Sequence, residues 1–171
     1  MKRIIFVVLA AIGLAVGAAA PSQAAKPAPT VNPAYWGHWT SPALVYDATG
    51  TTSFKVSEAV SEWRKSGWNV SMTTDPTKAN IKVLPEQPLS GAIGEATLVS
   101  SGSVITGCTV KLGPAFANMP YSEHMAIHEL GHCGGLPHST NPKSVMYAAT
   151  NSYLAMTKPS GQDIQWMAGN Y

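Results

Sequence analysis

The chain has 171 residues, 45% of them apolar, and a formal net charge of +2. Removing Lys2 and Arg3 would leave nine basic and nine acidic residues, without a basic cluster or a phosphate-binding glycine loop. This balance gives no reason to expect nucleic acid or an anionic membrane surface as a partner. The length allows one domain with a hydrophobic core and is too short for two.

The first 24 residues have the pattern of a secretory signal peptide. Lys2 and Arg3 precede an apolar run, and small residues at 18–20 or 22–24 offer a cleavage site. The alternative is a membrane anchor, which needs about 18 or more apolar residues, and the run is close to that length. The cleavage signals and the Pro/Ala-rich stretch behind the run favour removal. We therefore expect a secreted, extracellular protein with a signal peptide at 1–24, a flexible leader at 25–34 and one domain over 35–171.

Strand and helix patterns follow one another along the remaining chain. Aromatic and β-branched residues predict a first strand region, and later strands follow the same criterion. The predicted strands are Tyr35–Tyr46, Asn69–Thr73, Asn80–Leu84, Glu95–Ser100 and Ser103–Leu112. Apolar residues at helical spacing predict a helix at Phe54–Lys65, and further helices are expected at Ser122–Cys133, with Ser122 or Asn118 as N-cap, and at about Ser160–Ala168. Strands with helices packed on one face indicate an α+β domain.

The run from His128 to His138 contains a His-Glu-x-x-His pattern extended by a glycine and a third histidine. On a helix, His128 and His132 lie one turn apart on the same face, so both imidazoles can reach one ion. Gly135 can take the positive φ that ends the helix and lets His138 return to that ion. Three imidazoles leave the fourth position of a tetrahedral zinc open, which is the arrangement of a catalytic site.

Two alternatives stand beside this interpretation. The histidines could be unrelated surface or core residues, although the full pattern rarely occurs by chance. The zinc could also be purely structural. Glu129 argues against that, because a site that only holds the fold needs no carboxylate to move a proton.

The run His128–His138 resembles the zinc-binding consensus of the metzincin metallopeptidases. Ser144–Tyr147 resembles the methionine-containing turn of that clan, and both its spacing and its Met-Tyr pair are similar to those of the matrixins. Lys158–Ile164 resembles the start of the matrixin C-terminal helix. The resemblance implies a twisted, mostly parallel sheet with an antiparallel edge strand, an active-site helix and a C-terminal helix.

The resemblance also implies a mechanism. One catalytic Zn²⁺, bound by His128, His132 and His138, would lower the pKa of a water from 15.7 to about 7. Glu129 would take the proton of that water and pass it to the leaving amine. An extended peptide or protein substrate would lie antiparallel to an exposed strand edge, for which Glu95–Ser100 is the candidate. The chain is thus expected to be a zinc metalloendopeptidase and a monomer.

Five further residues have predicted roles. Met146 is expected to form a hydrophobic floor beneath the imidazoles without binding the ion. His124 is either a partly exposed helix histidine or, if the matrixin pattern holds, a lining of the pocket for the side chain after the cleaved bond. Tyr147 is a second candidate for that pocket and is not expected to bind zinc. Cys108 and Cys133 suggest one disulfide, with free buried thiols as the alternative.

The sequence departs from the matrixin pattern in several places. Residues 90–103 lack the His/Asp-rich segment that carries the matrixins' structural zinc and calcium, so calcium is not expected. Gly134 replaces a larger apolar residue, and Ala148 and Thr150 replace residues of the specificity-pocket wall. Substrate preference therefore does not carry over. Two other functions stay open: a non-catalytic secreted binding protein that contains zinc, and a zinc amidohydrolase acting on a non-protein amide.

Overall fold

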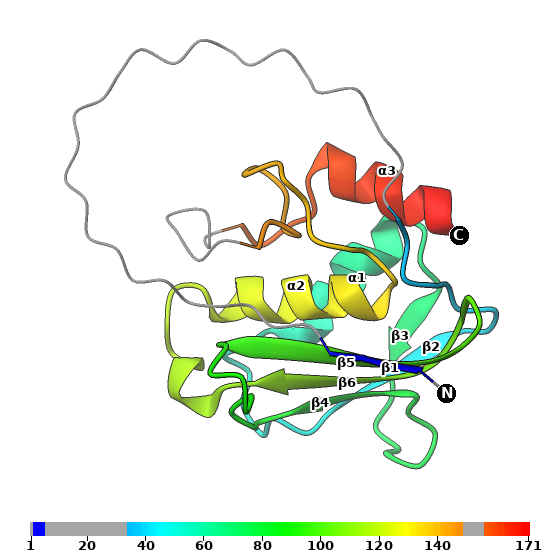
Figure 1. Cartoon of the computed structure of the whole chain (residues 1–171). Helices are drawn as coiled ribbons and strands as arrows, with labels where there is room; N and C mark the ends of the chain where they lie inside the picture. The colour runs from blue at the N-terminus through cyan, green and yellow to red at the C-terminus, as the bar shows by residue number, and fades with distance from the viewer. Residues whose placement is uncertain (1, 6–33, 149–155) are drawn as a thin grey trace, which may run out of the picture.

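The computed structural model describes residues 2–5, 34–148 and 156–171, which form one sheet with helices packed on it (Figure 1). The strand order in the six-stranded sheet is β1-β5-β6-β4-β2-β3. The strands are β1 (Lys2–Ile5), β2 (Ala43–Asp47), β3 (Val70–Met72), β4 (Ile81–Leu84), β5 (Gly94–Ser101) and β6 (Val104–Leu112). The helices are α1 (Val56–Lys65), α2 (Ser122–Cys133) and α3 (Gly161–Asn170), with a short 3₁₀ helix at Pro114–Phe116.

The sheet is mixed, with parallel pairing at its centre. β2 pairs in parallel with β3 and β4, and β4 with β6, whereas β5 runs antiparallel to β6. This confirms the expected α+β fold with a mostly parallel sheet and an antiparallel strand at its side. Of the predicted first strand region, only Ala43–Asp47 forms a strand; the part before it is extended, with a single bridge from His38 to Val104.

β1 adds a further antiparallel strand along the outer edge of β5. Its residues Lys2 to Ile5 pair with Ser100 to Thr97. These residues belong to the predicted signal peptide, whose remaining residues, together with most of the predicted leader, lie outside the described part of the chain. β5 is therefore second from the edge while residues 2–5 are attached, and it becomes the edge strand once they are absent.

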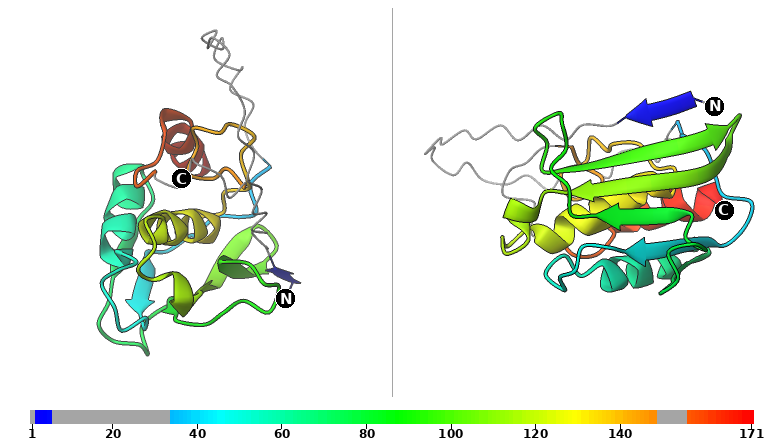
Figure 2. Two further views of the ribbon diagram at one scale, coloured as in Figure 1. Left: turned by 90° about the vertical axis from the view of Figure 1, so that its left-hand side faces the viewer. Right: turned by 90° about the horizontal axis from the view of Figure 1, so that it is seen from below.

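The helices lie on one face of the sheet, as the view from below shows (Figure 2). In α1 the buried residues Val56, Ala59, Val60 and Trp63 follow helical spacing and face α2 and the sheet. In α2 almost every residue is buried, because the sheet, α1 and the C-terminal part surround it. α3 lies on the opposite side of α2 from the sheet. No helix in the described residues has the length and apolar character needed to cross a membrane.

The helix starts differ from the predictions at α2 and agree at α3. The N-cap of α2 is Tyr121, without a side-chain cap, so neither Ser122 nor Asn118 has the predicted role. The Ser122 hydroxyl instead donates to the Ser53 carbonyl at 2.8 Å. Because of this tertiary contact, the hydroxyl does not cap the first turn of α2. Ser160 caps α3 through a capping box with Asp163.

Cys108 and Cys133 form a disulfide, with their Cα atoms 5.7 Å apart. Cys108 lies in β6, and Cys133 is the last residue of α2, directly after His132. The bond therefore fixes the end of α2 to the centre of the sheet. The alternative of two free buried thiols does not apply.

Candidate metal centre

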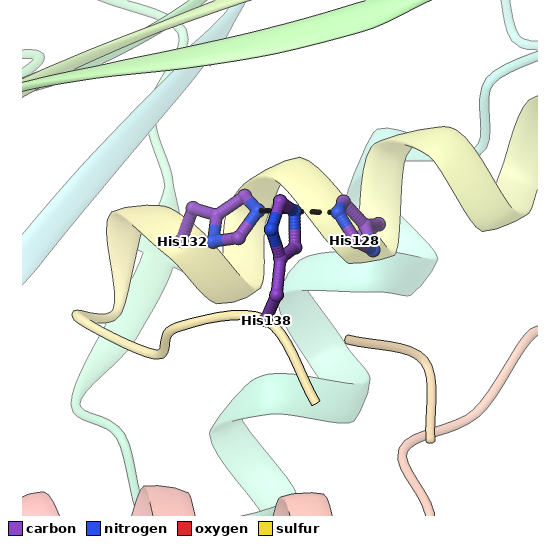
Figure 3. Close-up of side chains that lie close together, drawn as sticks. All are labelled: His128, His132 and His138. Carbon is purple, nitrogen blue, oxygen red and sulfur yellow. Dashed lines mark hydrogen bonds between the residues drawn. The ribbon is translucent and has the colours of Figure 1, made fainter. Parts of the chain in front are cut away.

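Three histidine side chains converge at the end of α2. His128 and His132 project from one face of the helix, and His138 returns from the loop that follows it (Figure 3). The Nε2 atom of His132 lies 3.1 Å from that of His128 and 3.1 Å from that of His138. In the described residues, these three are the one group of histidine, cysteine or acidic side chains close enough together to hold a metal ion.

Hydrogen bonds on the other ring nitrogens fix the tautomers of two of these rings. The Nδ1 atom of His128 lies 2.6 Å from the Val145 carbonyl, and that of His132 lies 2.8 Å from the Leu136 carbonyl. Because a carbonyl oxygen only accepts, each Nδ1 carries the proton and each Nε2 presents a lone pair.

Two facing lone pairs at 3.1 Å have no proton between them and repel unless they share a cation. A tetrahedral zinc with bonds of about 2.0–2.1 Å would place neighbouring nitrogens about 3.3 Å apart. The two Nε2 separations from His132 are close to this value, and the three ligand atoms all lie within 4.8 Å of one another. The site therefore fits a zinc ion.

Burial keeps these imidazoles neutral. It lowers the pKa of His128, His132 and His138, and the neighbouring imidazoles lower the first two further; the pKa of His132 falls to about 3. The neutral ring is the form that offers a lone pair to a metal, so the site is prepared for binding at neutral pH.

The turn after α2 is a Schellman motif. Leu136 N–H donates to the Gly131 carbonyl at 3.1 Å, and Gly135 N–H donates to the His132 carbonyl at 2.8 Å. Gly135 has the expected positive φ, +88°, and a Cβ there would also collide with the Gly37 carbonyl. The motif returns the chain to the site and presents the Leu136 carbonyl to the His132 ring.

Met146 packs against α2, the helix that carries His128 and His132; its expected place beneath the imidazoles stays a prediction. It is fully buried, and its sulfur fills the space where a side chain at Gly131 would project. At Gly134, a Cβ would lie 2.6 Å from Cε of Met167. A methionine from α3 thus fills the volume left by the larger apolar residue expected in a matrixin.

Asp163 was not predicted, although it holds the turn that carries Met146. Its buried carboxylate accepts hydrogen bonds from the Ser144 hydroxyl and from Val145 N–H at 3.0 Å. It also accepts from the backbone N–H and the hydroxyl of Ser160 at 2.7 and 2.6 Å. The sequence signal was the capping pattern Ser160-x-x-Asp163. Since the Val145 carbonyl accepts from His128, Asp163 is linked to the site through the backbone of the single residue Val145.

Glu129 lies buried between α2 and β5. The backbone of Ala96 hydrogen-bonds to its carboxyl group, while Oε2 has no partner among the described protein atoms. Burial raises its pKa well above the usual value, and the charge of Glu95 adds to the effect. A Cβ at Gly94 would lie 2.8 Å from Oε1, so a glycine there leaves room for the carboxyl group.

Of the two candidate pocket residues, His124 lies beside a candidate ligand. His124 is only 4% exposed, so the alternative of a partly exposed histidine is wrong; its Nδ1 lies 2.9 Å from the Met156 carbonyl, and its ring centroid is 5.9 Å from that of His128. Tyr147 forms a bridge with Ser139 directly after Met146. Residues 149–155, which include Thr150, lie outside the described residues.

Four features together define the metzincin class of zinc peptidases. They are a mixed sheet, a His-Glu-x-x-His helix, a third histidine after a glycine turn and a buried methionine in a turn that follows. The Matrixin family model matches residues 38–171, so the chain belongs to the matrixin family of metallopeptidases, as its motifs indicate. The chain is also similar to a zinc-dependent peptidase from Methanocorpusculum labreanum (strain Z), with 16% identity, a TM-score of 0.44, and coverage of 74% of this chain and 100% of that one. No curated protein gives a significant match.

Proposed function

We propose that this protein is a secreted zinc-dependent endopeptidase with one catalytic Zn²⁺ held by His128, His132 and His138. The observation that carries the proposal is the set of three converging Nε2 atoms beside a buried, partly unpartnered glutamate. Bound zinc would supply a Lewis acid and a water with a pKa of about 7.

Glu129 is the general base of the proposed reaction. It follows the first ligand in sequence, and one of its carboxylate oxygens has no partner among the described protein atoms. The carboxylate takes a proton from the attacking water and passes it to the leaving amine nitrogen. Burial raises its pKa well above the usual value, which makes the carboxylate a stronger base.

The proposed substrate is an extended peptide that pairs with the outer edge of β5. The antiparallel pairing of β1 with Thr97–Ser100 supports this, because an extended segment of the chain pairs with that edge in the same direction. Removal of residues 1–24 as a signal peptide would free the edge. His124 and Tyr147 are proposed to line the pocket for the side chain after the cleaved bond. The mature enzyme is proposed to be extracellular and monomeric.

The test combines casein cleavage with zinc analysis on the secreted protein. We expect zinc-loaded wild-type protein to cleave casein, and a chelator to abolish cleavage reversibly. Glu129→Gln is expected to lose at least about a hundredfold in activity, since general bases contribute about 10²–10⁴, while it retains one zinc per chain. His132→Ala, the matched control, should lose zinc and activity together.

The alternatives predict different results. A non-catalytic zinc protein would give folded, zinc-loaded wild type that cleaves no casein, and Glu129→Gln would change nothing. A zinc amidohydrolase would hydrolyse small non-peptide amides and leave casein intact. Either result would contradict the endopeptidase.

A further inference from the structure

Trp36, which lies before the first strand of the domain, packs on two of the three histidines. Its ring stacks on His132, with centroids 4.8 Å apart and an interplanar angle of 26°. It also meets His138 edge-on, with centroids 6.4 Å apart at 78°. Both geometries are favourable for aromatic pairs. The contact joins residues about a hundred positions apart in the sequence, so no local pattern predicts it.

The backbone on both sides of Trp36 is fixed. Trp36 N–H donates to the Gly135 carbonyl at 2.9 Å, so the residue is tied directly to the turn between the second and third histidines. His38 bonds to β6 in both directions: its N–H donates to Ser103 at 2.9 Å, and its carbonyl accepts from Ile105 at 2.8 Å.

The end of α3 secures the same segment. The Asn170 side-chain amide donates to the Gly37 carbonyl at 2.8 Å and to the Gly134 carbonyl at 3.0 Å. It therefore holds the Trp36 segment and the end of α2 at a fixed separation. The position of the indole follows from these bonds as well as from its own packing.

The three histidines differ in what orients them. Val145 and Leu136 carbonyls fix His128 and His132 through Nδ1. For His138, by contrast, the described residues provide no hydrogen-bond partner at Nδ1, and the indole edge is a ring contact that constrains it. For His132, the indole face adds to the carbonyl and prevents rotation of the ring out of its plane.

We propose that Trp36 is a positioning residue of the metal centre, which holds His132 by its face and His138 by its edge. The inference rests on the zinc site of the proposed function and concerns a residue outside the family motif. Groups that orient metal ligands typically contribute 10–100-fold to metal affinity. An indole also excludes water from one side of the site.

The test compares zinc affinity in three variants of the full mature chain. Trp36→Ala removes the contact, Trp36→Phe keeps a smaller flat ring, and Trp68→Phe alters another buried indole, which stacks on Tyr171. Zinc dissociation constants are measured by competition with a chromogenic chelator. The visible absorption band of the cobalt-substituted protein reports ligand geometry, and the melting temperature of the zinc-free protein reports general stability.

We expect Trp36→Ala to weaken zinc binding by about tenfold or more and to alter the cobalt band, with a small change in the zinc-free melting temperature. Trp36→Phe should recover most of the affinity. Trp68→Phe should lower the melting temperature and leave zinc affinity at the wild-type value.

Two outcomes would overturn the role of Trp36. One is wild-type zinc affinity and an unchanged cobalt band in Trp36→Ala. The other is a loss of affinity that only follows a loss of zinc-free stability, with no recovery in Trp36→Phe. Wild-type protein that binds zinc and cleaves no peptide would contradict the peptidase and not Trp36, because neither readout uses a substrate.

Discussion

At the scale of single residues, two of the candidate ligands are oriented by hydrogen bonds from the ring nitrogen that does not face the metal position. His128 and His132 donate from Nδ1 to backbone carbonyls and so direct Nε2 to the metal position. Glu129 differs from the histidines, because one of its carboxylate oxygens is buried and has no hydrogen-bond partner among the described protein atoms. The protein therefore stores an unfavourable group at the position where the proposed chemistry needs one.

Glu129 should reduce the stability of the metal-free protein at neutral pH. Its folded-state pKa is raised, so below the ordinary value of 4.5 both states are protonated and no penalty exists. Above 4.5 the unfolded chain ionises first, and the folded state loses stability. Glu129→Gln should therefore raise the free energy of unfolding by more than about 1 kcal/mol at pH 7, and not at pH 4.

Urea unfolding of chelator-treated wild type and variant at the two pH values measures this difference. Glu95→Gln serves as a control, because Glu95 is partly exposed and should give a smaller change. Equal stability of Glu129→Gln and wild type at pH 7 would contradict the burial argument.

Asp163 should couple the methionine turn to the metal ligands. Asp163→Asn places an amide donor against the donors of Val145 and Ser160, so we expect a loss of about 2 kcal/mol in unfolding free energy and weaker zinc binding. Ser160→Ala should cost only about 1 kcal/mol, because it removes a helix cap and leaves the turn bonded to Asp163. Chemical denaturation and chelator competition give both values, and equal effects of the two variants would rule out the special role of Asp163.

At the scale of elements, the end of α2 allows the third candidate ligand to reach the site. The helix stops one residue after His132, and the following loop brings His138 back to it. The Schellman motif closes the helix after Cys133, and Gly135 crosses the Gly37 backbone so closely that a Cβ at Gly135 would collide with the Gly37 carbonyl. The same crossing brings Trp36 onto His132. The positions of His138 and of the Trp36 indole thus both depend on the close approach of the backbones at Gly37 and Gly135.

Gly135→Ala should be among the most destabilising single substitutions in the domain. It combines a positive φ with a collision against backbone, and we expect a loss of more than about 2 kcal/mol together with reduced zinc affinity. Gly161→Ala is the matched control: a Cβ there meets nothing within 4 Å, and alanine favours the helix. Thermal unfolding compares the two. Similar melting temperatures would contradict the crossing argument.

At the scale of the whole molecule, the site joins parts distant in the sequence. α2 supplies two ligands and Glu129, the loop after it supplies the third ligand, and the C-terminal part supplies Met146 and Asp163. The disulfide connects the end of α2 to the sheet, which lies on the other side of the helix from α3.

Loss of the disulfide should loosen the whole domain. The bond closes a loop with a sequence separation of 25, and such a closure stabilises by about 3 kcal/mol. The double variant Cys108→Ser/Cys133→Ser should lose about that amount in denaturant unfolding, both with and without zinc, because zinc that binds only the folded state stabilises both proteins equally when its affinity is unchanged. The wild-type protein under reducing conditions is the control. An unchanged midpoint would contradict the prediction.

Local patterns predicted those parts of the fold that depend on neighbours in sequence. The spacing of Val56, Ala59, Val60 and Trp63 predicted α1, and a final helix was predicted at about Ser160–Ala168, where α3 begins. The N-cap of α2 was wrong because Ser122 bonds to Ser53, a contact that no local pattern encodes.

The sequence by itself determined which side chains are the candidate metal ligands and general base, and where the turn at Gly135 falls, because these depend on spacing along one helix and its end. Only the tertiary structure decided how those groups are oriented. Trp36, Asp163 and the Leu136 carbonyl act through packing and hydrogen bonds, most of them between segments far apart in sequence. Such contacts exist only after the chain has folded, because spacing fixes direction within a helix and carries no information about which distant surface will meet it.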